Sequence, residues 1–200
     1  MKNMIITGFV LIIAIIVSMG CVNIFNSDIK PNAEEYSIIS ETNRVRTNPK
    51  GYALELHSEL DANRSAWDQS RIGRYEAAIA TLNSAAVQSP LSYDYGLFLA
   101  ARDHAEDMIE NNLFSHVGSD GSSPNDRMDR YGTYSGARGE NVAAGTNNDT
   151  GASMVLAWVL SPGHLSNMLR ENYTLIGTAH LSGHPGYNWI SVQKFAGGKN

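Results

Sequence analysis

Two histidines and one glutamate stand in short, glycine-containing stretches of this 200-residue chain. They are His116 in "FSHVG", Glu140 in "RGENVAAG" and His164 in "SPGHLSN". Imidazole and carboxylate groups can exchange protons with a substrate or bind a divalent ion when a fold brings them together. The neighbouring glycines allow the backbone of each stretch to bend and pack closely. These three residues are therefore the first candidates for chemistry.

Each candidate also has a structural alternative. His116 follows an apparent helix and could cap its C-terminal end, where the helix dipole favours a cation. Glu140 could bind loop amides or stand near the start of a following helix. His164 could simply hydrogen-bond a loop carbonyl. The residue types alone leave these alternatives open.

Several familiar active-site motifs are absent from the sequence. It contains no His-Glu-x-x-His zinc helix, no Gly-x-Ser-x-Gly nucleophile elbow, no phosphate-binding Gly-x-x-x-x-Gly-Lys loop and no dinucleotide fingerprint. Cys21 is the single cysteine, so the rest of the chain has neither a disulfide nor a thiol nucleophile. A net charge of −5 argues against a nucleic-acid partner, because phosphate contacts require a basic surface.

Six helices are predicted between residues 36 and 170. The strongest pattern runs from Leu91 to Asn112, where apolar residues recur at helical spacing and place His104 on a buried stripe. We therefore expect His104 to be a core histidine. Ser161 can cap, and Pro162 can open, a short helix that carries His164. Further helices are expected near 36–47, 52–60, 72–82 and 152–160.

The C-terminal part of the sequence predicts strands instead. Residues 175–181 and 187–195 are β-rich runs separated by a Gly- and Pro-containing turn, which indicates an antiparallel hairpin. Helices followed by a hairpin favour an α+β fold.

The N-terminal segment predicts export. Lys2 is followed by an apolar run that ends at Met19, and Gly20 and Cys21 come next. We expect residues 1–21 to be a signal peptide whose lipobox-like end makes Cys21 a lipidation site, or else an uncleaved signal anchor. Residues 22–34 form a polar linker, and residues 35–198 form one folded domain. The domain is then extracytoplasmic, either held at the cell surface by this membrane anchor or secreted.

Four motifs in a fixed order resemble a known family. They are Ala101–Met108, Phe114–Arg127, the Gly-Glu-Asn stretch at 139–145 and Trp158–Leu169. Together they are similar to the prokaryotic extracellular branch of the CAP superfamily, which comprises cysteine-rich secretory proteins, antigen 5 and pathogenesis-related 1. The resemblance covers about residues 36–196. It implies a three-layer α-β-α sandwich with an antiparallel sheet.

The resemblance also implies a cleft shared by two histidines and two acidic residues. His116, Glu140 and His164 match three of these positions. The fourth is missing, because the glutamate that follows the helical tryptophan in other branches is replaced in Trp158-Val-Leu-Ser161. Two imidazoles and one carboxylate suffice to bind Zn²⁺, or more weakly Mn²⁺ or Cu²⁺, with a position left for water.

Three further residues are expected to support the cleft. Asn141 is predicted to order the Gly-Glu-Asn turn, and Arg127 to pair with a carboxylate beneath the loop. Ser161 is the predicted helix cap beside His164.

The predicted function is a non-enzymatic binding module whose cleft holds a divalent metal or a small ligand, such as a lipid or a component of the cell envelope. The alternative is a metal-assisted hydrolase of peptide or envelope substrates. A third possibility is a surface scaffold in which the cleft is vestigial. The resemblance favours the fold more strongly than any of these functions, because function depends on the site.

Overall fold

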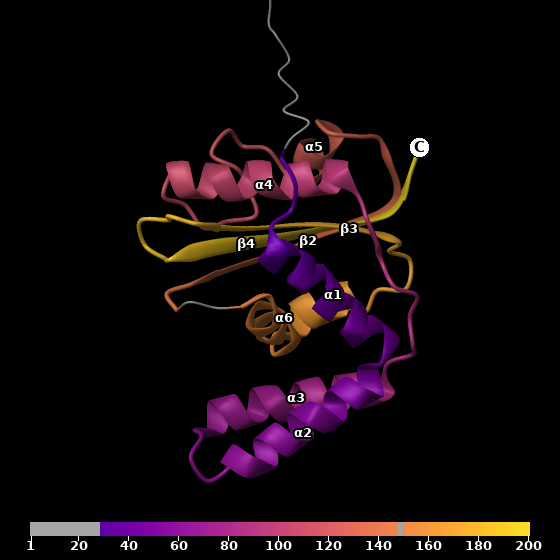
Figure 1. Ribbon diagram of the computed structural model, residues 1–200, viewed down its shortest axis with the longest axis vertical. Coiled ribbons are helices and arrows are strands. Elements are labelled where there is room, and N and C mark those ends of the chain that lie inside the picture. The colour runs from indigo at the N-terminus through magenta and orange to yellow at the C-terminus, as the bar shows by residue number, and fades with distance from the viewer. Residues whose placement is uncertain (1–28, 148–149) are drawn as a thin grey trace, which may run out of the picture. The chain divides into compact units, whose positions relative to one another are not determined.

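The computed structural model describes residues 29–147 and 150–200 (Figure 1). The contacts divide the chain into two units, Met1–Lys30 and Pro31–Asn200, and almost all described residues belong to the second. The predicted signal segment and Cys21 lie outside the described residues. Within the described part, no helix is long and apolar enough to span a membrane.

Seven helices and four strands make up the unit Pro31–Asn200. In chain order they are α1 (Ala33–Thr47), α2 (Pro49–Asn63), α3 (Gln69–Ser84), β1 (Ser92–Tyr93), α4 (Tyr95–Glu110), α5 (Pro124–Asp129), β2 (Tyr134–Gly145), α6 (Gly151–Val159), α7 (Pro162–Met168), β3 (Leu175–Ser182) and β4 (Trp189–Lys199).

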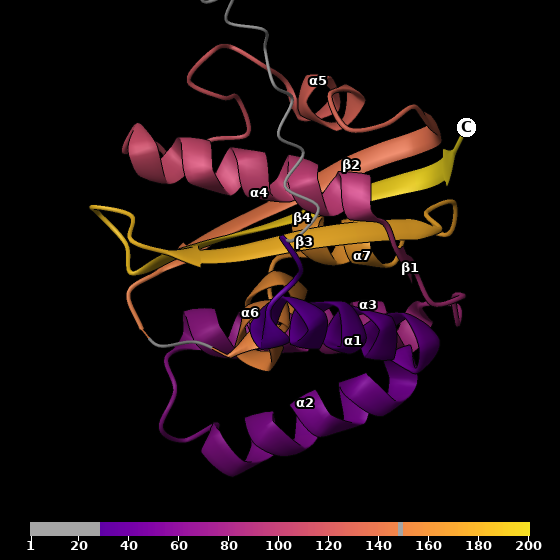
Figure 2. The same ribbon diagram turned by 45° about the horizontal axis from the view of Figure 1, so that its top comes forward.

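A four-stranded sheet lies at the centre, in the order β1-β3-β4-β2. Its strands pair antiparallel except for β1, which runs parallel to β3. Helices α4 and α5 cover one face, and α1, α6 and α7 cover the other (Figures 1 and 2). The hairpin of α2 and α3 packs beyond this second layer. The three-layer α-β-α sandwich that the resemblance predicts is therefore confirmed, with the parallel strand β1 added.

The core has a main part on the side of α1, α6 and α7 and a smaller part beneath α4. The main part includes the fully enclosed aromatic rings of Trp158, Tyr75 and Tyr173. Beneath α4, the alanines Ala101 and Ala105 pack against apolar residues of β3 and β4. Small residues on that face let α4 lie close to the sheet.

Two predicted elements differ from the structure. The helix expected from Leu91 begins at Tyr95, because Ser92 and Tyr93 pair with β3 and the side chain of Asp94 accepts a hydrogen bond from the amide of Leu97 as the N-cap. The Gly-Glu-Asn stretch, predicted as a turn ordered by Asn141, lies within the long strand β2. The glycine and polar residues of this stretch do not follow a strand pattern, yet β2 pairs with β4 over nearly its whole length.

Candidate functional site

The site centres on a contact between His116 and Glu140. His116 lies in the loop after α4, beyond the helix end at Glu110, so it does not cap that helix. Its Nδ1 is 2.7 Å from Oε1 of Glu140, which lies on β2. The imidazole is 57% exposed, whereas the carboxylate is 1% exposed. The carboxylate fixes one ring nitrogen, and the exposed ring faces solvent.

Two buried cations hold the other oxygen of Glu140. Arg127 donates from Nη2 to Oε2 over 3.1 Å, and the ammonium of Lys194 contacts the same oxygen. Arg127 therefore pairs with a carboxylate as its position in the sequence predicts. Burial disfavours the ionised form of Glu140, but the hydrogen bond with His116 and the charges of Lys194 and His104 outweigh burial and lower the pKa of Glu140 to about 2.

The two candidate histidines differ in the direction of their pKa shifts. The hydrogen bond and charge of Glu140 raise the pKa of His116 above the ordinary 6.5, against the opposing effect of burial. Burial lowers the pKa of His164, and the nearby charge of His116 lowers it further. His116 is therefore the more readily protonated of the two.

Arg127 also shapes the loop that carries His116. Its guanidinium donates to the main-chain oxygens of Ser122 and His116, over 2.7 Å each. One buried side chain thus binds both the loop and the carboxylate on β2, which fixes the position of the imidazole relative to Glu140.

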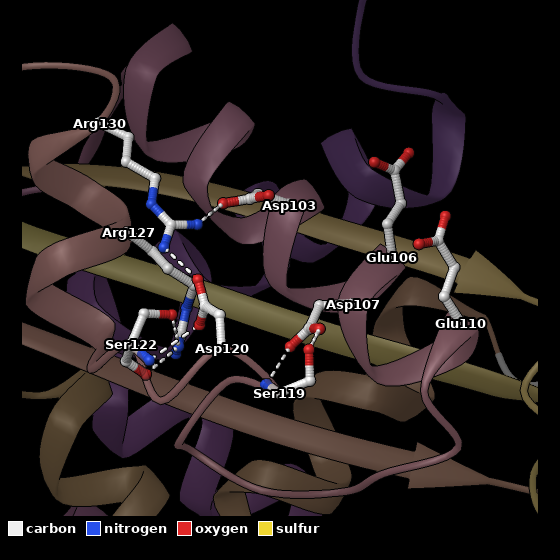
Figure 3. A pocket seen from close by; sticks show the side chains of 9 residues that line it. All are labelled: Asp103, Glu106, Asp107, Glu110, Ser119, Asp120, Ser122, Arg127 and Arg130. Atoms are coloured by element: carbon white, nitrogen blue, oxygen red, sulfur yellow. Dashed lines mark hydrogen bonds and ion pairs between the residues drawn. The ribbon is translucent and has the colours of Figure 1, made fainter.

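The same loop is tied to α4 and α5 at its surface (Figure 3). Asp107 accepts hydrogen bonds from the amide and hydroxyl of Ser119, and Arg130 bridges Asp103 and Asp120. These residues, together with Arg127, line a pocket of about 230 Å³. Asp107 and Arg130 thus restrain the loop in addition to Arg127.

His164 is positioned through a network of amides between α7 and β2. Asn141 is fully buried and donates to the main-chain oxygen of His164 over 3.3 Å and to Oε1 of Gln193 over 3.0 Å. Asn167 donates to Oδ1 of Asn141 over 2.9 Å. Asn141 therefore supports the site as a link between strand and helix, which differs from its predicted role in a turn.

Ser161 does not act as predicted. It occupies the backbone position before α7, and Pro162 opens the helix as expected, but the Ser161 side chain makes no capping hydrogen bond. The fixed backbone angle of proline starts this short helix without that bond.

His104 and Lys194 lie at the site, although the sequence did not predict that they contribute to it. His104 is buried as predicted and its Nε2 hydrogen-bonds the main-chain oxygen of Ser115 over 2.8 Å, yet this nitrogen also lies 3.9 Å from Glu140. Lys194 was not predicted to contribute to the site. In the sequence, Lys194 is a charged residue that alternates along the strand with Val192 and Ala196, both of which are buried. A charge in such a buried series indicates a buried partner.

The arrangement does not fit the predicted metal site of His116, Glu140 and His164. Both oxygens of Glu140 already bind side chains, and one of them faces two cations. Across residues 29–147 and 150–200, no group of three or more His, Cys, Asp or Glu side chains is placed to hold a metal ion. What the geometry offers is an exposed imidazole held by a buried, charge-compensated carboxylate.

Comparison with known proteins finds bacterial relatives of this chain. The uncharacterised protein YkwD of Bacillus subtilis is 34% identical over 132 residues, which are 64% of this chain and 49% of that protein. The chain thus spans about half the length of this relative. An extracellular protein with an SCP domain from Bacillus anthracis is 27% identical, with a TM-score of 0.47 over 64% of this chain and 37% of that one.

A more distant structure matches over more of the chain. Venom allergen-like protein 4 of Schistosoma mansoni is 13% identical, with a TM-score of 0.50 over 85% of this chain and 92% of that one, which shows a shared fold. The model of the cysteine-rich secretory protein family, CAP, matches residues 39–195. The chain therefore belongs to the cysteine-rich secretory protein family, as the four motifs predicted.

Proposed function

We propose that this chain is an extracytoplasmic binding module that uses the imidazole of His116 to hold a component of the cell envelope. The observation that carries the proposal is the contrast in exposure within the charged cluster. Glu140, Arg127 and Lys194 are buried, whereas more than half of the His116 side chain is exposed. The cluster therefore presents one polar group to a ligand and keeps the others for support.

The surroundings of His116 indicate what kind of ligand would fit. Phe114 and Val117 flank it in the same loop and are 47% and 53% exposed. The ring of Phe114 also packs on Tyr187, with centroids 5.7 Å apart. A ligand with one hydrogen-bonding group and a neighbouring apolar part would match this surface, as lipids and the peptide parts of envelope polymers do. The export signal predicted from residues 1–21 would bring the domain to such a ligand.

A hydrolase is the second candidate, because a buried carboxylate that holds one nitrogen of a histidine can prepare the other nitrogen to act as a general base. The metal-assisted form of this reaction is disfavoured by the pairing of Glu140 with two cations. A hydrolase would still need a substrate pocket beside His116.

Co-sedimentation of the full chain with purified cell-wall sacculi and with lipid vesicles tests both candidates. His116→Ala removes the proposed contact, and His57→Ala is the matched control, because His57 is 58% exposed on the distant helix α2. We expect about tenfold weaker binding for His116→Ala, as for one lost hydrogen bond, and no change for the control. Equal binding by both variants would contradict the proposal. Soluble fragments released by the wild type but not by His116→Ala would favour the hydrolase.

A further inference from the structure

We propose that Lys194 is a built-in cation of this site, which occupies the oxygen of Glu140 that a divalent metal ion would need and so excludes the ion. This inference is independent of the identity of the ligand. It concerns how the cleft balances the negative charge of its buried carboxylate.

Both carboxylate oxygens of Glu140 already have side-chain partners. Oε1 of Glu140 bonds to Nδ1 of His116 over 2.7 Å, and Oε2 contacts both Lys194 and Arg127. A metal ligand must give a lone pair to the ion, and each oxygen of Glu140 already directs at least one lone pair at another side chain, with two such partners on Oε2. The carboxylate side chain is 1% exposed, so water cannot readily replace these partners.

The sheet itself sets the ion pair between Glu140 and Lys194. Glu140 on β2 and Lys194 on β4 are direct partners in the antiparallel register. Such cross-strand partners have Cβ atoms about 4.5–5.5 Å apart, so their side chains meet without any loop having to close. The Lys194 side chain is 0% exposed and therefore cannot turn away into solvent. A metal ion would have to displace a group that the fold holds in place.

The charge of the site also opposes a divalent ion at Glu140. Glu140 carries one negative charge and already faces the two positive charges of Arg127 and Lys194. A divalent ion would place two more positive charges in the same poorly hydrated space, where repulsion between like charges is weakly screened. Removing Lys194 would leave Oε2 of Glu140 with Arg127 as its one remaining cation and would remove one unit of this repulsion. The substitution should therefore turn a metal-excluding site into a metal-accepting one.

Calorimetric titration of the full chain with Zn²⁺ tests this inference. Lys194→Met removes the ammonium and keeps an apolar stem of similar length, and Lys194→Gln keeps a hydrogen-bond donor. Lys50→Met is the matched control, since Lys50 is an exposed lysine of α2. We expect both Lys194 variants to bind one Zn²⁺ on the order of 10- to 100-fold more tightly than the wild type and the control. Adding His116→Ala should abolish the gain.

Equal Zn²⁺ binding by the wild type and the folded Lys194 variants, whether tight or undetectable, would overturn the inference. Thermal melts establish which variants fold. If neither Lys194 variant folds, the same titration is read from the wild type and Glu140→Gln. One-to-one Zn²⁺ binding by the wild type that is lost in Glu140→Gln would overturn the inference. Absence of Zn²⁺ binding by the wild type would agree with it.

Discussion

Glu140 shows how one residue can organise a site without being exposed to a ligand. Its carboxylate binds His116, Arg127 and Lys194, and His104 lies within 3.9 Å. A buried carboxylate is costly unless it is paired and hydrogen-bonded, and here both conditions are met. The same carboxylate therefore orients the exposed histidine and compensates the buried cations. Sequence motifs identified Glu140 and His116. They did not show that Arg127 and Lys194 both contact Oε2 of Glu140.

His104 gives the clearest pH prediction at this scale. Burial lowers its pKa to about 4, so the folded protein keeps it neutral while the unfolded chain protonates it near the ordinary 6.5. The unfolded state therefore binds more protons between these values. As the pH falls from 6.5 to 4, the free energy of unfolding should decrease by on the order of 2–3 kcal/mol on account of His104.

Denaturant unfolding at several pH values measures this contribution. His104→Gln should flatten the pH dependence between 6.5 and 4. An unchanged pH dependence in a folded His104→Gln protein would show that burial does not keep His104 neutral.

At the scale of elements, the site depends on how closely helices and strands approach. Helix α4 precedes the His116 loop, and it packs against β3 at Gly177. A Cβ added at Gly177 would lie 2.1 Å from the amide nitrogen of Phe98 and 2.2 Å from the carbonyl carbon of Leu97. These are backbone atoms of a helix, which cannot move aside as a flexible side chain can. The contact thus sets the distance between α4 and the sheet.

Gly177→Ala should therefore destabilise the fold by on the order of 3 kcal/mol. Gly163→Ala is the matched control, because a Cβ at that position in α7 meets no atom within 4 Å. It should be neutral or stabilise by up to about 1 kcal/mol, since alanine favours a helix. Chemical denaturation of both variants measures the two effects. Equal stability of Gly177→Ala and the wild type would show that the contact is looser than described.

Periodicity predicted several elements well and failed at others for identifiable reasons. The helical pattern around Leu97 and His104 and the β-rich hairpin were confirmed as α4, β3 and β4. Strand β2 was missed because its glycines and polar residues resemble those of a turn. Its pairing with β4 depends on residues about fifty positions away, and no local pattern reports such pairing.

At the scale of the whole molecule, the order of helices and strands predicted the fold class, and the four motifs predicted the family. The contact of Lys194 with Glu140 could not be predicted, because it arises from the register of β2 on β4. Recognition of motifs therefore reached His116, Glu140 and Arg127. The second buried cation, Lys194, became visible only with the sheet.

Glu140 holds His116 as a charged partner and leaves the imidazole ring exposed. NMR titration of the histidine side chains in the wild type measures this pairing, with His116→Gln used to assign the resonance. We expect a pKa of His116 above 6.5, so this pair stabilises the fold fully below pH 6.5 and loses that contribution as the pH rises through the raised pKa. A pKa of His116 at or below 6.5 would show that an ionised Glu140 does not hold the imidazole.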